Sequence, residues 1–144
     1  MPPLNWTLSV YAVAIAAGTV FGPGAVEAAD PVISMELNKT EPSGAGCRFS
    51  FVLRNETGRD LPAAAYEAVL FNTDGVIDQM SVLEFGALTS GKTVVRQFEM
   101  PGVDCTKAGR LLINGPVGCT ATNTPGHCSA ALTVSSRSTF PLVQ

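Results

Sequence analysis

The single histidine of the chain, His127, stands directly before Cys128 in the stretch TPGHCSA. A zinc or copper site draws on several His, Cys or carboxylate ligands, so this histidine would need partners from elsewhere. The methionines Met35, Met80 and Met100 fall in separate apolar runs, where methionine commonly fills gaps in packing. We therefore expect a solvated His127, methionines packed in the core or at its rim, and neither a metal site nor another cofactor.

Catalytic groups are equally sparse. The chain has no Gly-x-Ser-x-Gly nucleophile motif, and the stretch SSRST at 135–139 is typical of a polar strand end. Folding could bring carboxylates together as a general acid and base, but their local positions fit turns and strand faces better: Asp74, Asp78, Glu84 and Glu99. The sequence thus favours a protein that is not an enzyme, and an enzyme of unrecognised type is one alternative.

The chain contains four cysteines, which allow three pairings: Cys47, Cys105, Cys119 and Cys128. The short polar loop between Cys119 and Cys128 favours a local clip, which leaves Cys47 to pair with Cys105. The spacing of the clip is too wide for a redox Cys-x-x-Cys, so a structural disulfide is favoured. In the chain-entropy model the longer closure contributes about 4 kcal/mol of stability.

The N-terminal segment is typical of an export signal. Residues 8–21 (LSVYAVAIAAGTVF) form an uncharged run that is too short for a membrane-spanning helix but suits a signal-peptide core. Small residues at Val26 and Ala28 predict cleavage before Ala29. We expect a signal peptide at 1–28, a mature domain at 29–144 with no membrane span, and a periplasmic or secreted location. An uncleaved N-terminal anchor is the alternative.

The charge balance restricts the class of partner. All nine Lys and Arg and eleven of the twelve acids lie after the predicted signal, so the mature charge is 9 minus 11, or −2. Nucleic-acid binding usually requires a concentrated basic face, and attraction to anionic lipid requires a basic cluster. The sequence therefore predicts neither of these partners.

The mature region has the period-two alternation of β-strands. Seven strands are predicted, at 33–39, 47–54, 64–72, 76–85, 93–100, 110–114 and 130–136. In the second, Cys47, Phe49, Phe51 and Leu53 share one face, because successive side chains alternate across a strand. Glycines at turn positions separate the runs, as in RNETG and NTDG. Short strands spaced by such turns predict an all-β, antiparallel, immunoglobulin-like β-sandwich.

The segments VLRNETGRDLPAAAYEAVLFNTDGVIDQ and LTSGKTVVRQFEM resemble small bacterial exported immunoglobulin-like domains, including the FxLYD type. The matching positions form an Asn-x-Thr-Gly bend, an aromatic strand end before Asp-Gly, and a later glycine turn: Asn55, Thr57, Gly58, Leu70, Phe71, Asp74, Gly75 and Gly91. The whole mature chain is also similar to uncharacterised exported bacterial proteins. The resemblance implies a β-sandwich and an exported setting, and it implies no activity.

These observations favour a binding protein that acts through surface contacts with a protein or envelope component. Loops on a rigid scaffold are natural contact sites, and the candidates are the 55–60 bend, the 72–75 turn and the 120–127 loop. Exposed strand edges offer a second route, by addition of a partner strand. The alternative is a periplasmic small-ligand or metal-binding protein that uses His127, a nearby methionine and carboxylates.

Overall fold

The computed structural model describes residue 3, residues 32–118 and residues 126–144. The strands are β1 (Val32–Ser43), β2 (Gly46–Asn55), β3 (Leu61–Asn72), β4 (Ile77–Leu88), β5 (Thr93–Pro101), β6 (Ala108–Pro116), β7 (Ala131–Ser136) and β8 (Leu142–Val143), with one short 3-10 helix, η1 (Gly126–Cys128). All seven predicted strands are present, and β8 is too short to leave a sequence signal. The predicted signal-peptide core at 8–21 and the cleavage site before Ala29 lie outside the described residues.

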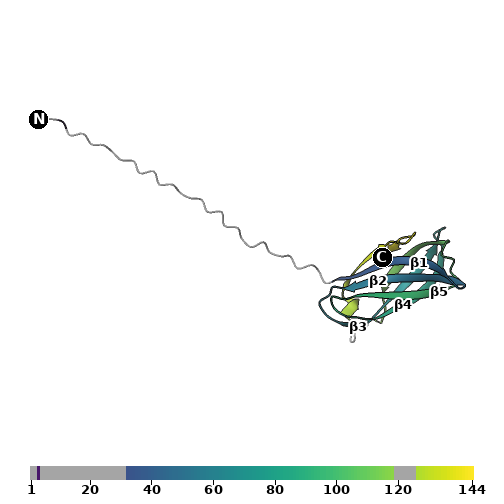
Figure 1. Ribbon diagram of the computed structural model, residues 1–144, viewed down its shortest axis with the longest axis horizontal. Helices are drawn as coiled ribbons and strands as arrows, with labels where there is room; N and C mark the ends of the chain where they lie inside the picture. Colours follow the sequence, from purple (N-terminus) through teal and green to yellow (C-terminus); the bar gives the residue numbers. More distant parts are fainter. Residues whose placement is uncertain (1–2, 4–31, 119–125) are drawn as a thin grey trace.

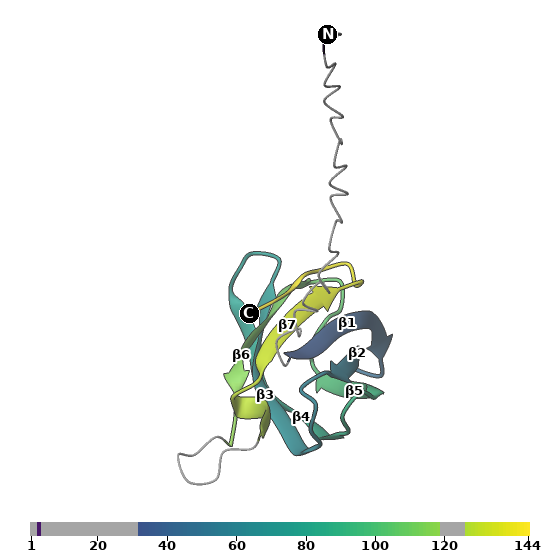
Figure 2. The same ribbon diagram turned by 90° about the vertical axis from the view of Figure 1, so that its left-hand side faces the viewer.

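The strands form two four-stranded sheets that pack face to face (Figures 1 and 2). Sheet A has the order β5-β2-β1-β7, and sheet B has the order β4-β3-β6-β8. This arrangement confirms the predicted β-sandwich. Two neighbouring pairs, β1 with β7 and β6 with β8, run parallel instead of antiparallel. Both involve the last two strands, β7 and β8, which lie beside strands that run in the same direction.

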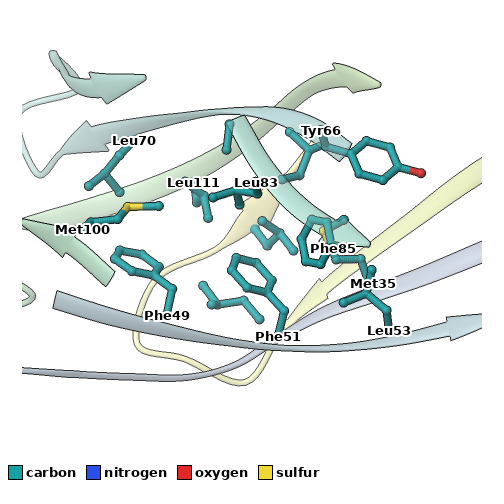
Figure 3. Packing of buried hydrophobic residues seen from close by; sticks show 14 of the residues in the cluster. Met35, Phe49, Phe51, Leu53, Tyr66, Leu70, Leu83, Phe85, Met100 and Leu111 are labelled. Atoms are coloured by element: carbon teal, nitrogen blue, oxygen red, sulfur yellow. The ribbon is translucent and has the colours of Figure 1, made fainter. Parts of the chain in front are cut away.

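Alternation along β2 builds one wall of the core. Cys47, Phe49, Phe51 and Leu53 are all 0% exposed, as their spacing predicts. Figure 3 shows Phe49 and Phe51 pointing from this strand toward side chains of the opposite sheet. The inner face of sheet A is therefore apolar along the length of β2.

A group of aromatic rings joins the two sheets within this core. Phe51 of β2 packs edge to face against Phe85 of β4, with ring centroids 5.6 Å apart, and against Phe98 of β5 at 5.9 Å. Tyr66 of β3 continues the group at 6.1 Å from Phe85 and lies at one end of the cluster in Figure 3. Such rings bury large apolar areas in a preferred geometry, so they fix how the sheets face each other.

A buried asparagine holds the connection between β2 and β3. Asn55 is 1% exposed, and its Nδ2 donates hydrogen bonds of 2.8 Å to the carbonyl oxygens of Arg59 and Leu88. Its Oδ1 accepts from the Thr57 amide at 3.0 Å and from the Thr57 hydroxyl at 2.7 Å. Gly58 has a φ of 79°, as its turn position predicts. The Asn-x-Thr-Gly motif is thus a fully hydrogen-bonded bend.

The same residue ties together the two connections that cross between the sheets at this end. The Gly91 amide, in the β4–β5 connection, donates to the Asn55 carbonyl at 2.7 Å. The Ser90 amide donates to Oδ1 of Asp60, in the β2–β3 connection, at 2.8 Å. Both crossings therefore meet around the end of β2.

A disulfide ties the other end of β2 to the connection that crosses from sheet A to sheet B. Cys47 is bonded to Cys105, which lies in the connection that leads from β5 to β6, and their Cα atoms are 5.2 Å apart. This pairing confirms the prediction. Cys128 is also disulfide-bonded. Cys119, its predicted partner, lies outside the described residues, so that pairing stays a prediction.

We predict that Asn55→Ala lowers the free energy of unfolding by about 3 kcal/mol, because buried backbone groups lose their hydrogen-bond partners. Asn72→Ala is the control. Asn72 Oδ1 also accepts two backbone amides in a turn, but these bonds are exposed, so the expected loss is about 1 kcal/mol or less. Urea unfolding followed by circular dichroism measures both losses, and equal losses would contradict the role given to Asn55.

We expect the double variant Cys47→Ala/Cys105→Ala to be less stable by about 4 kcal/mol, because the disulfide closes a loop with a sequence separation of 58 residues. Replacing both cysteines avoids a free thiol. The measurement is the urea midpoint and slope of the purified protein under oxidising conditions. A loss below about 1 kcal/mol would show that the two sheets hold together without this bond.

Candidate functional site

The structure corrects the prediction for His127. Its side chain is buried, at 2% exposure, and its ring lies edge to face against Tyr66 with centroids 5.7 Å apart. The Ala65 amide of β3 donates to Nε2 at 3.5 Å, and Sγ of Cys128 lies 3.7 Å from the same nitrogen. The prediction of a solvated residue was wrong because η1 packs against β3, a contact that no local pattern reveals.

Small and charged groups hold η1 in this position. A Cβ atom on Gly126 would lie 2.6 Å from Cδ2 of the buried Leu61, so a larger residue here would require the Leu61 side chain to shift. Arg59 donates from Nη2 to Oγ of Ser129, just after the helix, at 3.3 Å. The helix is therefore fastened to the end of the sandwich where the β2–β3 connection lies.

The electrostatics of this cluster fit a structural role. Burial lowers the pKa of His127, against a smaller opposing effect of hydrogen bonds with the backbone at Val117, Ala65 and Ala63. Burial also raises the pKa of Tyr66 to about 12. Both rings are thus neutral near pH 7, and both are enclosed by the protein, so the pair forms a packing contact between η1 and β3.

The other residues considered as metal ligands do not gather around the histidine. No group of three or more His, Cys, Asp or Glu side chains that could hold a metal occurs among the residues the structure describes. Met35 and Met100 lie in the core at 1% and 3% exposure, as predicted. Met80 differs, because it lies on the outer face of sheet B and exposes 55% of its surface.

Two of the carboxylates considered as an acid and base pair, Asp78 and Glu84, lie too far apart for that role. Glu99 on β5 receives a 2.5 Å hydrogen bond from Nε of Arg48, which lowers its pKa and keeps it ionised. Asp78 and Glu84 lie six residues apart on β4, which at the rise of a strand is roughly 20 Å. Asp74 sits in the β3–β4 turn. A general acid and base acting on one bond must be much closer than this.

The three loops predicted as contact sites differ in exposure and in how far their polar groups are already hydrogen-bonded. The 55–60 bend uses its polar side chains for the internal hydrogen bonds of Asn55, Thr57 and Asp60. The 72–75 turn is exposed and leaves the Asp74 carboxylate free of ion pairs among the described residues. Most of the 120–127 loop lies outside the described residues, apart from its buried end at His127.

The exposed apolar side chains concentrate instead on β4. The large hydrophobic residues with at least half of their surface exposed are Val76 (60%), Ile77 (54%), Met80 (55%), Val82 (50%) and Val95 (58%). Among these described residues, Ile77, Met80 and Val82 lie on β4, Val76 directly precedes it, and Val95 lies on β5. Sequence reasoning did not single out this surface. Alternation from the buried Phe85 gives the signal, because it places Met80 and Val82 on the opposite, outer face.

These residues continue across sheet B as an apolar row. Met80 of β4 pairs with Val69 of β3, Val69 pairs with Leu112 of β6, and Leu112 pairs with Val143 of β8. Val69 is only 5% exposed although it lies on the outer face, since its neighbours cover it. We name Ile77, Met80, Val82 and this row the sheet B patch.

No family model matches the chain, and no curated protein sequence does either. Among solved structures, the fold is similar to that of a protein described as IrmA from Escherichia coli. The TM-score is 0.55 at 15% sequence identity, and the match covers 75% of this chain and 92% of that one. This likeness shows a shared β-sandwich fold, while the FxLYD type is not confirmed.

Within the described residues, no helix is both long enough and apolar enough to span a membrane. The bond between Cys47 and Cys105 is the kind that forms and persists in oxidising compartments.

The buried histidine predicts a pH dependence. Because its pKa is lowered in the folded protein, unfolding takes up a proton, so stability falls as the pH drops below the ordinary value near 6.5. His127 is the only histidine, so His127→Phe should flatten the dependence between pH 7.5 and 5.5. Urea unfolding at both pH values tests this, and an unchanged slope in the variant would contradict it.

Proposed function

We propose that this is an exported, non-enzymatic β-sandwich protein that acts by binding a protein partner in the periplasm or outside the cell. The sheet B patch is the observation that carries this proposal. Its exposed residues Ile77, Met80 and Val82 are not needed to fill the core, since Leu83 and Phe85 of the same strand already do so at 2% and 0% exposure. Apolar patches of this kind commonly mark sites of protein contact.

The disulfide and the resemblance to exported immunoglobulin-like domains support the compartment. A bond between Cys47 and Cys105 that closes the sandwich is stable outside the reducing cytosol. The signal peptide at 1–28 and the FxLYD type belong to the same proposal.

No specific observation favours a small-ligand site. One hollow among the described residues runs across the outer face of sheet A, where Glu36 pairs with Arg137 at 2.9 Å. Arg54, which also lines the hollow, pairs with Glu56 at 2.8 Å. The charges that could orient a ligand are thus already paired with each other.

Cross-linking in intact cells of the producing organism, followed by mass spectrometry, tests the proposal. We expect discrete adducts with one or a few exported proteins, and we expect the variant Met80→Lys/Val82→Lys to reduce them. The control is Val95→Lys, which changes an equally exposed valine on β5 and should leave the adducts unchanged.

Two results would contradict the proposal. One is the absence of adducts with any protein although the sandwich is exported and folded. The other is a catalytic turnover that survives purification and disappears when one carboxylate is replaced.

A further inference from the structure

The two sheets differ in how their charges are used. The strands of sheet A carry four basic and three acidic residues, and its three acids all take part in ion pairs: Glu36, Glu41 and Glu99. The strands of sheet B carry one basic and three acidic residues: Arg110, Glu67, Asp78 and Glu84. None of these three acids forms an ion pair with a described residue.

The single basic residue of sheet B is engaged elsewhere. The guanidinium of Arg110 lies over the ring of Phe71, with Cζ 4.3 Å from the ring centroid. Glu67 receives a hydrogen bond from the amide of Asn114. The carboxylates of Asp78 and Glu84 therefore stay unneutralised. Glu84 shares the outer face with Met80 and Val82 by alternation, and Asp78 is exposed on the other side of them, at the bulge opposite Leu70 and Phe71.

Strand β4 lies at the edge of sheet B. The hydrogen bonds between the other strands of this sheet show which backbone amides and carbonyls of β4 face the open side. The Leu111 amide donates to the Pro141 carbonyl at 3.0 Å, away from β3. Because backbone groups alternate in direction along a strand, those of Leu112 point toward β3, where Leu112 pairs with Val69. The backbone groups of Val69 therefore point toward β6, and those of its neighbours point toward β4.

The same alternation reaches the edge. The backbone amide and carbonyl of Ala68, next to Val69, point toward β4, where Ala68 pairs with Ser81. Ser81 therefore bonds to β3, and the adjacent Met80 and Val82 direct their amides and carbonyls to the open side, where no other described strand pairs with β4. The same two residues thus present free backbone groups and exposed apolar side chains.

The other edge strands carry an inward basic side chain and a proline, or are short, whereas β4 is long and is protected only by acidic side chains and by bulges toward its ends; its run from Gln79 to Glu84 pairs regularly with β3. Edge strands are commonly blocked by charged side chains, by proline or by shortness. On β5, the Arg96 guanidinium turns inward to donate to the Phe85 carbonyl at 2.8 Å, and the strand ends at Pro101. Strand β8 has 2 residues and β7 has 6, whereas β4 has 12 residues with no Lys, Arg or Pro.

We propose that the β4 edge receives an extended segment of the partner protein as an added antiparallel strand. The segment would carry two apolar residues at alternate positions, opposite Met80 and Val82, and a Lys or Arg on each side, opposite Asp78 and Glu84. Opposite charges directly across a strand pair are stabilising. This inference rests on the proposed function, and it specifies the chemistry of the partner.

A second copy of the chain fits this edge less well. If two β4 strands pair antiparallel with Met80 opposite Val82, the register places Asp78 opposite Glu84 on both sides of the twofold axis. Like charges directly opposite are destabilising. If the register shifts so that Met80 of one copy lies opposite Met80 of the other, Val82 lies opposite Asp78, an apolar side chain against a charged one. Each of these two registers therefore contains an unfavourable pair.

A capped heptapeptide, Lys-Thr-Val-Thr-Val-Thr-Lys, reproduces the proposed pattern. We expect it to shift the amide resonances of Met80 and Val82 in a low-salt NMR titration of the purified protein. The peptide with Glu in place of both Lys should bind at least tenfold more weakly. The peptide with both valines N-methylated should lose binding, because it cannot donate the backbone hydrogen bonds.

Variants of the protein distinguish the contribution of charge to peptide binding from that of the apolar contact. In Asp78→Lys/Glu84→Lys, the preference should reverse, so that the Glu peptide binds about tenfold more tightly than the Lys peptide. Val82→Lys should weaken the Lys peptide at least tenfold, while Val95→Lys, on the edge strand of the other sheet, should leave its affinity unchanged. A thermal melt of each variant establishes that it is folded.

Three outcomes would overturn the inference. The first is that millimolar peptide causes no shift in the amide resonances of Met80 and Val82. The second is equal affinity of the protein for the Lys and Glu peptides. The third is a dimer in sedimentation velocity that Val82→Lys dissociates, since a second copy of the chain would then be the occupant of the edge. If the Lys peptide does not bind but cross-linked adducts with an exported protein are still found, the partner does not bind at the β4 edge. That result would contradict this inference and leave the proposed function standing.

Discussion

The hydrogen-bonded side chain of Asn55 is the constraint on which the arrangement of the sheets depends. Its amide and its backbone hold the β2–β3 and β4–β5 connections together, and each of these connections carries the chain from one sheet to the other. A buried amide with all its partners satisfied is costly to replace, because each lost bond leaves a desolvated backbone group. With the bond between Cys47 and Cys105, both ends of β2 are fixed across the sandwich.

Much of the fold could be predicted from the sequence because a strand with one buried face leaves a period-two pattern. Cys47, Phe49, Phe51 and Leu53 show it fully, and all four are buried. The pairing of β1 with β7 and the existence of β8 could not be predicted. Both depend on which strands become neighbours after the chain crosses between sheets, and no local periodicity carries that information.

The candidate site was harder to predict for the same reason. His127 reads as a loop residue until η1 is placed against β3, where burial and the Tyr66 ring determine its role. Met80 reads as core packing unless alternation is counted from the buried Phe85, which places it on the outer face, and the strand's own sequence does not show that its backbone is also free at an edge. Exposure at an edge is a property of the sheet order.

The parallel pairing of β1 with β7 has a consequence for how the molecule is made. Val32, the first residue of β1, lies beside Ala131, the first residue of β7, although β2 to β6 lie between these strands in chain order. One side of β1, an inner strand of sheet A, therefore stays uncovered until β7 has been synthesised. Contacts this far apart in sequence form slowly, so the pairing of β1 with β7 is expected to be a slow step in completing the sandwich.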